Sequence, residues 1–218
     1  MHKKMRYTTY LFDFDGTLVD SMPSYAAAML RVLTENGIAY GKDLIKVITP
    51  LGYLGTAKYY REQLGLKMTE DEIVARMKEY AYEEYAHRIP AKPHVVEVLR
   101  ALKEKGADLH VLTASPHAVL DVCLARLGMT ELFTNVWSCE DFGTTKADPK
   151  IYVMAAERIG KPVGEILFLD DNYNADKTAA SAGMKVCGVY DDSSSEYETE
   201  IRAVSDHYIK DFCELLAL

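Results

Sequence analysis

The second half of the chain alternates short apolar runs with amphipathic stretches, and this alternation limits the fold more than any other feature. Residues 93–105 carry apolar side chains at helical spacing and end at Gly106, and residues 108–113 form an apolar run of strand length. The further elements that we expect are helices over 116–127, 149–159 and 175–182 and strands over 135–138, 166–170 and 185–189. Such a series predicts an α/β fold, a parallel sheet covered by helices on both faces.

Residues 20–92 do not follow this alternation. The helices that we expect there cover residues 24–36, 54–64 and 69–86. Thr69 and Glu72 form the capping-box pattern that opens the last of them. No convincing strand pattern occurs in this segment, so we interpret it as all-helical.

A first strand over residues 11–14 is therefore separated from the next strand by a helical segment much longer than an ordinary crossover. An inserted helical domain is the economical explanation. We expect a core domain of residues 1–20 and 91–218 and a helical cap domain of residues 21–90.

Composition and charge exclude several classes of protein. The 218 residues are 49% hydrophobic and 27% charged, as in globular domains. The net charge of −8 argues against nucleic-acid binding, and no apolar run is long enough to span a membrane. The basic start MHKKMR precedes only a brief apolar segment, too short for a signal-peptide core. We therefore expect a cytoplasmic protein, as a monomer, with a dimer left open.

The cysteines and most histidines give no sign of a metal site. The cysteines are widely separated, form no CxxC pair and are expected to be buried free thiols: Cys123, Cys139, Cys187 and Cys213. Three histidines lie on expected elements without ligand partners and are interpreted as structural or surface residues: His87, His94 and His110. His117 follows Pro116 and either faces a pocket or is a surface residue at a helix start, and we favour the surface position.

Polar residues follow the expected strands at their carboxyl ends. They are Asp13 and Asp15 after the first strand, Thr113 and Ser115 after the second, Lys146 after the third, and Asp170 and Asp171 after the fourth. Ligands bind outside the carboxyl ends of the strands in an open parallel sheet, so we expect these side chains to converge on one pocket.

The chemistry of such a pocket follows from its charges. Carboxylates packed together repel one another and have raised pKa values unless a cation is present. Hard oxygen ligands beside a lysine suit Mg²⁺, which is commonly bound by carboxylates and a substrate phosphate. This combination favours phosphoryl transfer, with Asp13 as a nucleophile that forms an aspartyl phosphate.

The order of these motifs resembles the haloacid dehalogenase superfamily, in the subfamily whose all-helical C1 cap is inserted after the first motif. The resemblance rests on AspPheAspGlyThr, ValLeuThrAlaSer, Lys146 and LeuAspAspAsnTyrAsn, and it extends from Tyr10 to about Tyr190. It implies a Rossmann-like, doubly wound core and the activities of phosphoglycolate-phosphatase-like and β-phosphoglucomutase-like members.

The resemblance assigns separate roles to the first two acids. Asp13 corresponds to the nucleophile and is also a metal ligand. Asp15 corresponds to the general acid/base that protonates the leaving oxygen and then activates water, and its backbone carbonyl binds the metal.

The remaining motif residues correspond to phosphate and metal ligands. Thr113 is similar to the hydroxyl that hydrogen-bonds the phosphoryl group, with Ser115 or its backbone assisting. Lys146 resembles the lysine that neutralises the phosphate and orients the nucleophile. Asp171 resembles the principal Mg²⁺ ligand, and Asp170 binds either directly or through water.

The second acid narrows the choice among activities. A dehalogenase needs no second acid, because a halide leaves without a proton, and the family members that hydrolyse phosphonates also lack this acid. The presence of Asp15 therefore disfavours both activities. Mutases of the β-phosphoglucomutase type tend to carry a cap histidine where this chain has Tyr25. A Mg²⁺-dependent phosphatase of a small phosphorylated metabolite is left as the prediction.

Two alternative functions and one question about the cap stay open beside this prediction. A phosphosugar mutase is the first, and a catalytically silent regulator or binding module with the same fold is the second. The question about the cap concerns Lys58, which either contacts an anionic substrate tail or is simply solvated.

Overall fold

The computed structural model describes residues 6–218, apart from the side chain of Pro50. Most of the basic start considered above lies in residues 1–5, outside the described part. None of the helices described has both the length and the apolar character needed to cross a bilayer.

The chain divides into two compact units. The core unit comprises Met1–Asp20 and Pro90–Leu218, and the helical unit comprises Ser21–Ile89. This division differs from the boundaries expected from the sequence at one residue, Pro90, which belongs to the core unit.

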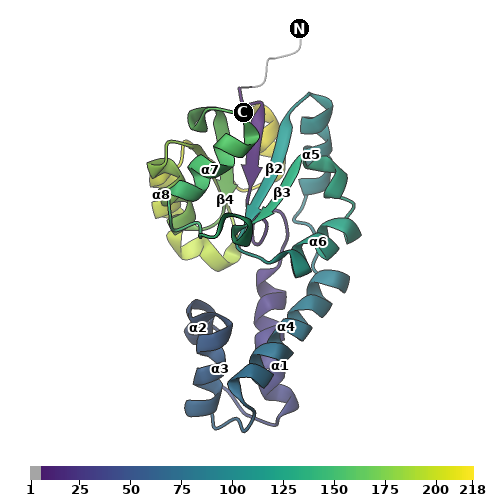
Figure 1. Cartoon of the computed structure of the whole chain (residues 1–218), viewed down its shortest axis with the longest axis vertical. Helices are drawn as coiled ribbons and strands as arrows, with labels where there is room; N and C mark the ends of the chain where they lie inside the picture. Colours follow the sequence, from purple (N-terminus) through teal and green to yellow (C-terminus); the bar gives the residue numbers. More distant parts are fainter. Residues whose placement is uncertain (1–5) are drawn as a thin grey trace. The chain divides into compact units, whose positions relative to one another are not determined.

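The described residues of the core unit form one sheet of six parallel strands, in the order β3-β2-β1-β4-β5-β6 (Figure 1). The strands are β1 (Thr9–Phe12), β2 (Asp108–Thr113), β3 (Asn135–Ser138), β4 (Ile166–Asp170), β5 (Lys185–Val189) and β6 (His207–Ile209). The strands β2 to β5 are confirmed with the bounds that the sequence predicts. The three-residue β6 is too short to produce a recognisable pattern and was not predicted.

The first strand begins and ends earlier than residues 11–14. It pairs with β4 up to Phe12, opposite Leu169. The Asp13 amide still donates to the Leu169 carbonyl at 2.8 Å, but the chain then turns, with the Gly16 amide donating to the Val19 carbonyl at 2.9 Å. Asp13 is therefore the first residue beyond the strand, at the carboxyl edge of the sheet.

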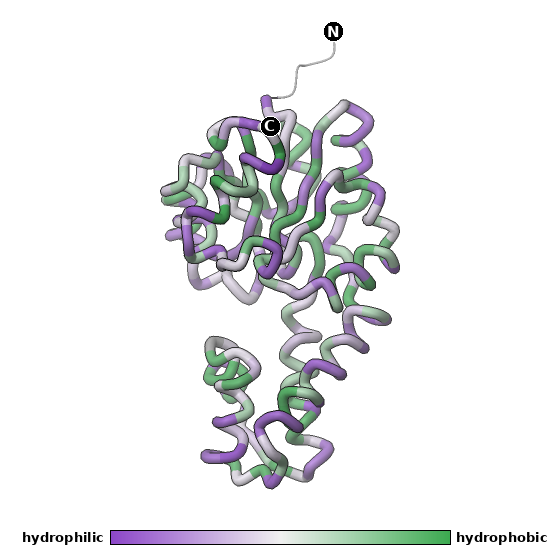
Figure 2. Tube along the Cα trace, in the orientation of Figure 1, coloured by the Kyte–Doolittle hydropathy of each residue, from purple (hydrophilic) through white to green (hydrophobic). Residues whose placement is uncertain are grey.

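Helices cover the sheet and bury its apolar side chains. They are α5 (Val95–Glu104), α6 (His117–Arg126), α7 (Lys150–Ile159), α8 (Tyr173–Ser181) and α9 (Glu198–Val204). Short 3-10 turns join them: η2 (Thr130–Leu132), η3 (Cys139–Phe142), η4 (Val163–Glu165), η5 (Asp192–Tyr197) and η6 (Phe212–Ala217). Figure 2 shows hydrophobic residues along the strands and alternating hydropathy around the helices. One cluster packs Phe168 of β4 against Tyr152 and Ile151 of α7.

The polar segment 191–196 is mostly exposed, but it is not an irregular loop. Most of it forms η5, and Asp191, which precedes it, is only 6% exposed. Asp191 accepts a hydrogen bond from the Ser193 amide at 2.9 Å and pairs with the Lys92 ammonium at 3.0 Å. These two partners compensate the cost of burying its charge.

The helical unit contains α1 (Met22–Glu35), α2 (Leu44–Ile48), the 3-10 turn η1 (Thr49–Leu51), α3 (Gly52–Glu62) and α4 (Glu70–His87). The capping box of Thr69 and Glu72 is confirmed at the start of α4. Apolar faces of these helices form a separate core, in which the buried Tyr60 donates to the Met29 carbonyl at 3.1 Å. The short α2 escaped prediction because five residues give too little periodicity.

The cysteines are free, as expected, but they do not share one environment. Cys123, Cys139 and Cys187 are buried, whereas Cys213 is exposed. Cys213 lies in η6, near the end of the chain, and its expected burial is wrong.

Candidate active site

The predicted nucleophile lies at the centre of a buried charge cluster. Asp13 follows β1, Asp170 ends β4, and Lys146 lies in the loop between η3 and α7. The Lys146 ammonium donates to Oδ1 of Asp13 and, at 2.8 Å, to Oδ2 of Asp170. Oxygens of Asp13, Asp170 and Asp171 lie within 4.8 Å of one another. Neighbouring strands thus bring together residues that are far apart in the sequence.

Burial and like charges make Asp13 unusually basic. Its burial is the largest cause, Asp170 and Asp15 add repulsion, and the pKa of Asp13 rises to about 8 despite the attraction of Lys146. Burial opposes the charge of Lys146 as well, but Asp13 and Asp170 raise the pKa of Lys146 well above its ordinary value. Lys146 therefore stays charged while the acids compete for its single positive charge.

The loop after β1 holds Asp171 in place. The buried Thr17 hydroxyl donates to Oδ1 of Asp171 at 3.3 Å. Gly16 has φ +79°, and a Cβ at Gly16 would lie 2.7 Å from the Asp171 carboxyl group. Burial, with Asp170 and Asp13 next, raises the pKa of Asp171 well above its ordinary value. Gly16 and Thr17 therefore shape the acid cluster.

The second predicted acid has a different partner. The Ser115 hydroxyl donates to Oδ2 of Asp15 at 2.5 Å, and the Ser115 amide donates to the Thr113 hydroxyl at 3.1 Å. Thr113 is buried at the end of β2 and keeps its hydroxyl proton for another acceptor. The structure thus joins Asp15, Ser115 and Thr113 in one chain of hydrogen bonds, while the proposed metal contact of the Asp15 carbonyl stays a prediction.

One buried acid escaped the sequence analysis. Asp176, in the first turn of α8, is fully buried, and neither carboxyl oxygen has a hydrogen-bond partner among the described residues. Burial, followed by Asp170 and Asp171, raises its pKa well above the ordinary value. An acid at a position that helical spacing assigns to the buried face of 175–182 was the signal that could have revealed it.

Lys92 is a second functional candidate that the sequence analysis missed. Its ammonium donates to the carbonyls of Gly16 and Tyr190, both at 2.6 Å, and to Asp191 at 3.0 Å. These bonds fasten the loop after β1 to the chain that follows β5. No local pattern distinguishes this lysine from a solvated linker residue, since its partners are remote in the sequence.

Tyr152 of α7 secures the loop that carries Lys146. Its hydroxyl lies 3.2 Å from the Lys146 carbonyl and 3.1 Å from the Ala175 carbonyl, and it donates to this pair of acceptors. The loop and the start of α8 are therefore connected behind the charge cluster.

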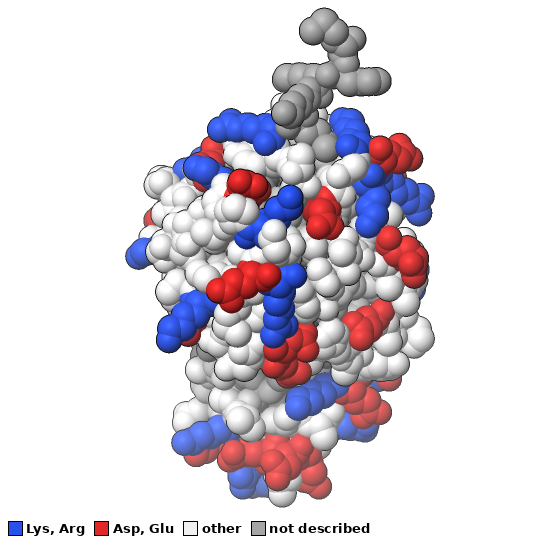
Figure 3. All heavy atoms as spheres, turned by 45° about the horizontal axis from the view of Figure 1, so that its top comes forward, with Lys and Arg blue, Asp and Glu red and all other residues white. Residues whose placement is uncertain are grey.

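His117 and Lys58 form ion pairs outside the buried charge cluster. His117 pairs with Asp121 and Asp141, both at 2.9 Å, and these partners raise its pKa. Lys58 lies on α3 of the helical unit, with its ammonium 3.9 Å from Glu62, and its contact with substrate stays a prediction. Charges of both signs are mixed on the face shown in Figure 3, in contrast to the buried acids around Lys146.

The donor set of the cluster fits a hard divalent cation. The ligands offered by Asp13, Asp170 and Asp171 are carboxylate oxygens, and the raised pKa values of Asp13 and Asp171 show that Lys146 alone does not balance their charge. Mg²⁺ prefers oxygen ligands of this kind. These residues therefore fit a magnesium ion.

Comparison with known proteins identifies the family. A model of the haloacid dehalogenase-like hydrolase family matches residues 7–183. The chain belongs to this family. A phosphoglycolate phosphatase of Haemophilus influenzae is 27% identical over 95% of this chain and 96% of its own length. The pyrophosphatase PpaX of Bacillus velezensis is also 27% identical, over 84% of this chain and 83% of its own.

Solved structures share the haloacid dehalogenase-like architecture over the whole chain. A predicted phosphoglycolate phosphatase from Haemophilus somnus superposes with a TM-score of 0.82 and covers 99% of both chains at 24% identity. The α/β fold with an inserted helical segment is thereby confirmed.

Proposed function

We propose that this hydrolase is a Mg²⁺-dependent phosphatase of small phosphorylated metabolites that works through an aspartyl phosphate. The observation that carries the proposal is the buried Lys146 ammonium shared by Asp13 and Asp170, next to Asp171 and at the carboxyl edge of the sheet. This arrangement supplies a nucleophile, a fixed cation and oxygen ligands for a metal within one buried cluster.

The reaction has two displacements at phosphorus. In the first, a carboxylate oxygen of Asp13 forms a bond to phosphorus while the bond to the leaving oxygen breaks, and Asp15 gives that oxygen its proton. In the second, Asp15 takes a proton from water, the water oxygen bonds to phosphorus, and the Asp13 carboxylate leaves. Inorganic phosphate is released, and both acids return to their starting protonation states.

Neighbouring groups supply orientation and charge. Lys146 keeps Asp13 oriented and places its positive charge where a phosphoryl group would approach. Ser115 fixes the direction of the Asp15 carboxylate, and the Thr113 hydroxyl is available to donate to a phosphoryl oxygen.

Asp13, Asp170 and Asp171 would hold the metal, and the fully buried Asp176 interacts electrostatically with Asp170 and Asp171. Mg²⁺, when bound, screens the repulsion between these carboxylates and the phosphate. A bound cation would lower the pKa of Asp13, because it favours the charged carboxylate. This change would help the reaction, since a carboxyl group with a pKa of about 8 must be ionised before it can attack.

The names of the relatives support small phosphate esters and anhydrides as the substrate class, since they include phosphoglycolate and pyrophosphate hydrolases. The mutase alternative would need a proton carrier in the cap, and Tyr25 is poorly suited to this role. The ring centroids of Tyr25 and Tyr53 are 6.1 Å apart, and burial raises the pKa of Tyr25 above that of an ordinary tyrosine. A phenol with a pKa above 10 is a poor proton carrier near neutrality.

The test is a panel of phosphorylated metabolites with Mg²⁺, in which both released phosphate and residual ester are measured. The proposal predicts that phosphate release equals ester loss for at least one compound and that a chelator stops it. Isomerisation of a sugar phosphate with little free phosphate would support the mutase instead. A complete lack of turnover across the panel and with p-nitrophenyl phosphate would support the silent binding module.

A further inference from the structure

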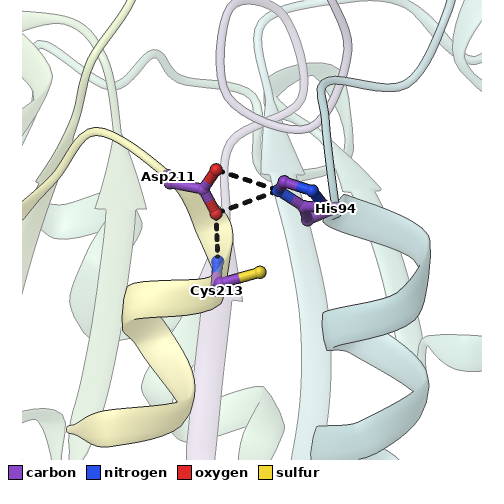
Figure 4. Close-up of side chains that lie close together, drawn as sticks. All are labelled: His94, Asp211 and Cys213. Atoms are coloured by element: carbon purple, nitrogen blue, oxygen red, sulfur yellow. Dashed lines mark hydrogen bonds and ion pairs between the residues drawn. The ribbon is translucent and has the colours of Figure 1, made fainter.

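A second group of potential metal ligands lies among residues that the proposed phosphatase reaction does not use. Figure 4 shows His94 at the start of α5 and Asp211 and Cys213 at the start of η6. One potential ligand atom from each of the three lies within 4.8 Å of the others. His94 and Asp211 are 117 residues apart in the chain, so the tertiary fold alone brings them together.

Asp211 is already held in position by both neighbours. Nδ1 of His94 lies 2.9 and 3.0 Å from the two Asp211 oxygens, and the Cys213 amide donates to Oδ1 of Asp211 at 2.7 Å. The sulfur of Cys213 projects toward the helix that carries His94 in Figure 4. Three different donor atoms, nitrogen, oxygen and sulfur, thus face one small volume.

The backbone of His94 is unusual. Among the described residues it is the non-glycine residue with a positive φ, at +64°. Such a left-handed conformation is unfavourable for a residue with a Cβ. His94 stands at the N-cap position of α5 but its side chain forms no cap hydrogen bond, so helix capping does not explain the conformation. The conformation does place the imidazole beside Asp211.

The spacing of the donors suits a tetrahedral ion. Zinc lies roughly 2.0–2.3 Å from nitrogen, oxygen and sulfur ligands, which puts two such ligands about 3.3–3.8 Å apart. The His94 and Asp211 donor atoms are 2.9 Å apart, and the Cys213 sulfur lies within 4.8 Å of both, so modest side-chain rotation brings the three donors to these separations.

We propose that His94, Asp211 and Cys213 form a binding site for a divalent transition metal, Zn²⁺ in the first place, that links α5 to η6. Imidazole and thiolate are ligands that zinc accepts and magnesium avoids. Binding displaces the proton of the Cys213 thiol, and the imidazole coordinates in its neutral form. With three protein ligands the site leaves a fourth position to water, and none of its residues belongs to the proposed reaction.

The different chemistry of the two sites makes the proposal testable in the intact protein. Excess Mg²⁺ occupies the carboxylate cluster, and Co²⁺ is then added as a spectroscopic substitute for zinc. Coordination by Cys213 predicts a thiolate-to-cobalt charge-transfer band that about one equivalent of Zn²⁺ abolishes. Zinc affinity is measured in parallel by competition with a chromophoric chelator.

Two variants probe the ligands and a third serves as control. Cys213→Ser removes the thiolate, and His94→Asn removes the imidazole while asparagine tolerates the left-handed backbone. Each should weaken zinc binding by more than tenfold, and Cys213→Ser should lose the charge-transfer band. His87→Asn, which changes an exposed histidine of the helical unit, should leave both unchanged. Circular dichroism shows whether each variant is folded.

The opposite results are equally clear. A folded wild type without the charge-transfer band would overturn the site. So would a band that persists in Cys213→Ser, because another cysteine would then be the ligand. Equal zinc affinity in wild type and His94→Asn would also contradict the proposal.

Discussion

Lys146 donates a hydrogen bond to Oδ1 of Asp13, and this contact sets a positive charge against the buried carboxylate that must ionise to attack phosphorus. The same ammonium holds Asp170 at 2.8 Å. Removing Lys146 therefore changes both the charge and the orientation of the nucleophile.

The Lys146→Met variant should lose about 10²- to 10³-fold in kcat/KM, because the fixed positive charge that stabilises the phosphoryl group in the transition state and orients Asp13 is gone. The acid limb of its pH profile should also move to higher pH, since Lys146 lowers the pKa of Asp13. Steady-state kinetics with saturating Mg²⁺ measure both effects. Lys161→Met, at an exposed lysine, is the matched control, and a loss below threefold in Lys146→Met would contradict this role.

Gly16→Ala should damage the acid cluster more than the backbone strain alone explains. The new Cβ would meet the Asp171 carboxyl group at 2.7 Å in addition to adopting φ +79°. We expect a loss of about 2–4 kcal/mol in the free energy of unfolding, from strain and overpacking together. Gly106→Ala, with φ +85° and no described atom within 4 Å of its Cβ, should lose only the strain part of about 1 kcal/mol. Equal losses in the two variants by denaturant unfolding would show that the contact with Asp171 is unimportant.

The Asp176→Asn variant separates the effect of this buried acid on Mg²⁺ binding from its effect on the stability of the metal-free protein. If Asp176 supports the metal ligands, the variant should bind Mg²⁺ about 10- to 100-fold more weakly. The metal-free variant should nevertheless be more stable than wild type at pH 8, because the carboxylate of Asp176 is charged in the unfolded chain and burial disfavours that charged form in the folded state, whereas asparagine carries no charge. Isothermal titration and thermal unfolding in chelator measure the two effects. Unchanged Mg²⁺ affinity would leave Asp176 without a role in the site.

The metal-free protein should lose stability as the pH rises. The pKa of Asp13 is about 8 when folded and about 3.9 when unfolded, so the folded state holds more protons between these values. The stabilisation that protonated Asp13 gives the folded state is fully present below about pH 4 and disappears by about pH 8. Thermal unfolding in chelator from pH 5 to pH 9 measures it, and the slope should be shallower in Asp13→Asn. Identical slopes in the two proteins would exclude Asp13 as the cause.

Added Mg²⁺ should reverse this loss. At about 100 times its Kd the metal stabilises the protein by about 2.7 kcal/mol, which corresponds to about 5–10 °C in Tm for a chain of this size. The rise should be larger at pH 8 than at pH 5, where protons compete for Asp13 and Asp171. A Tm that Mg²⁺ does not change at either pH would contradict metal binding by the cluster.

Apolar runs and turn residues in the sequence were sufficient to predict most strands of the sheet. The strands β2 to β5 are apolar runs bounded by turn residues, and their ends agree with the sequence prediction. The residues that follow them converge because parallel strands share one carboxyl edge. The first strand was misplaced by two residues, since Asp13 continues the hydrogen bonding for one residue while the strand itself ends at Phe12.

Long-range contacts could not be predicted in this way. Lys92 gains its role from Gly16 and Asp191, and His94 gains its neighbours from a segment 117 residues away. A linker lysine and an isolated histidine are ordinary surface residues by local pattern. Only the packing of distant segments distinguishes them.

The central claim is that phosphate passes through Asp13, and chemical trapping tests it most directly. Wild type and Asp15→Asn are quenched during turnover and reduced with borohydride, which converts an aspartyl phosphate to homoserine, and the peptide containing residue 13 is examined by mass spectrometry. With p-nitrophenyl phosphate, whose leaving group needs no proton from Asp15, the account predicts homoserine at position 13, more of it in Asp15→Asn because hydrolysis of the intermediate is slowed, and none in Asp13→Ala. Turnover without this product, or turnover that survives in Asp13→Ala, would contradict it.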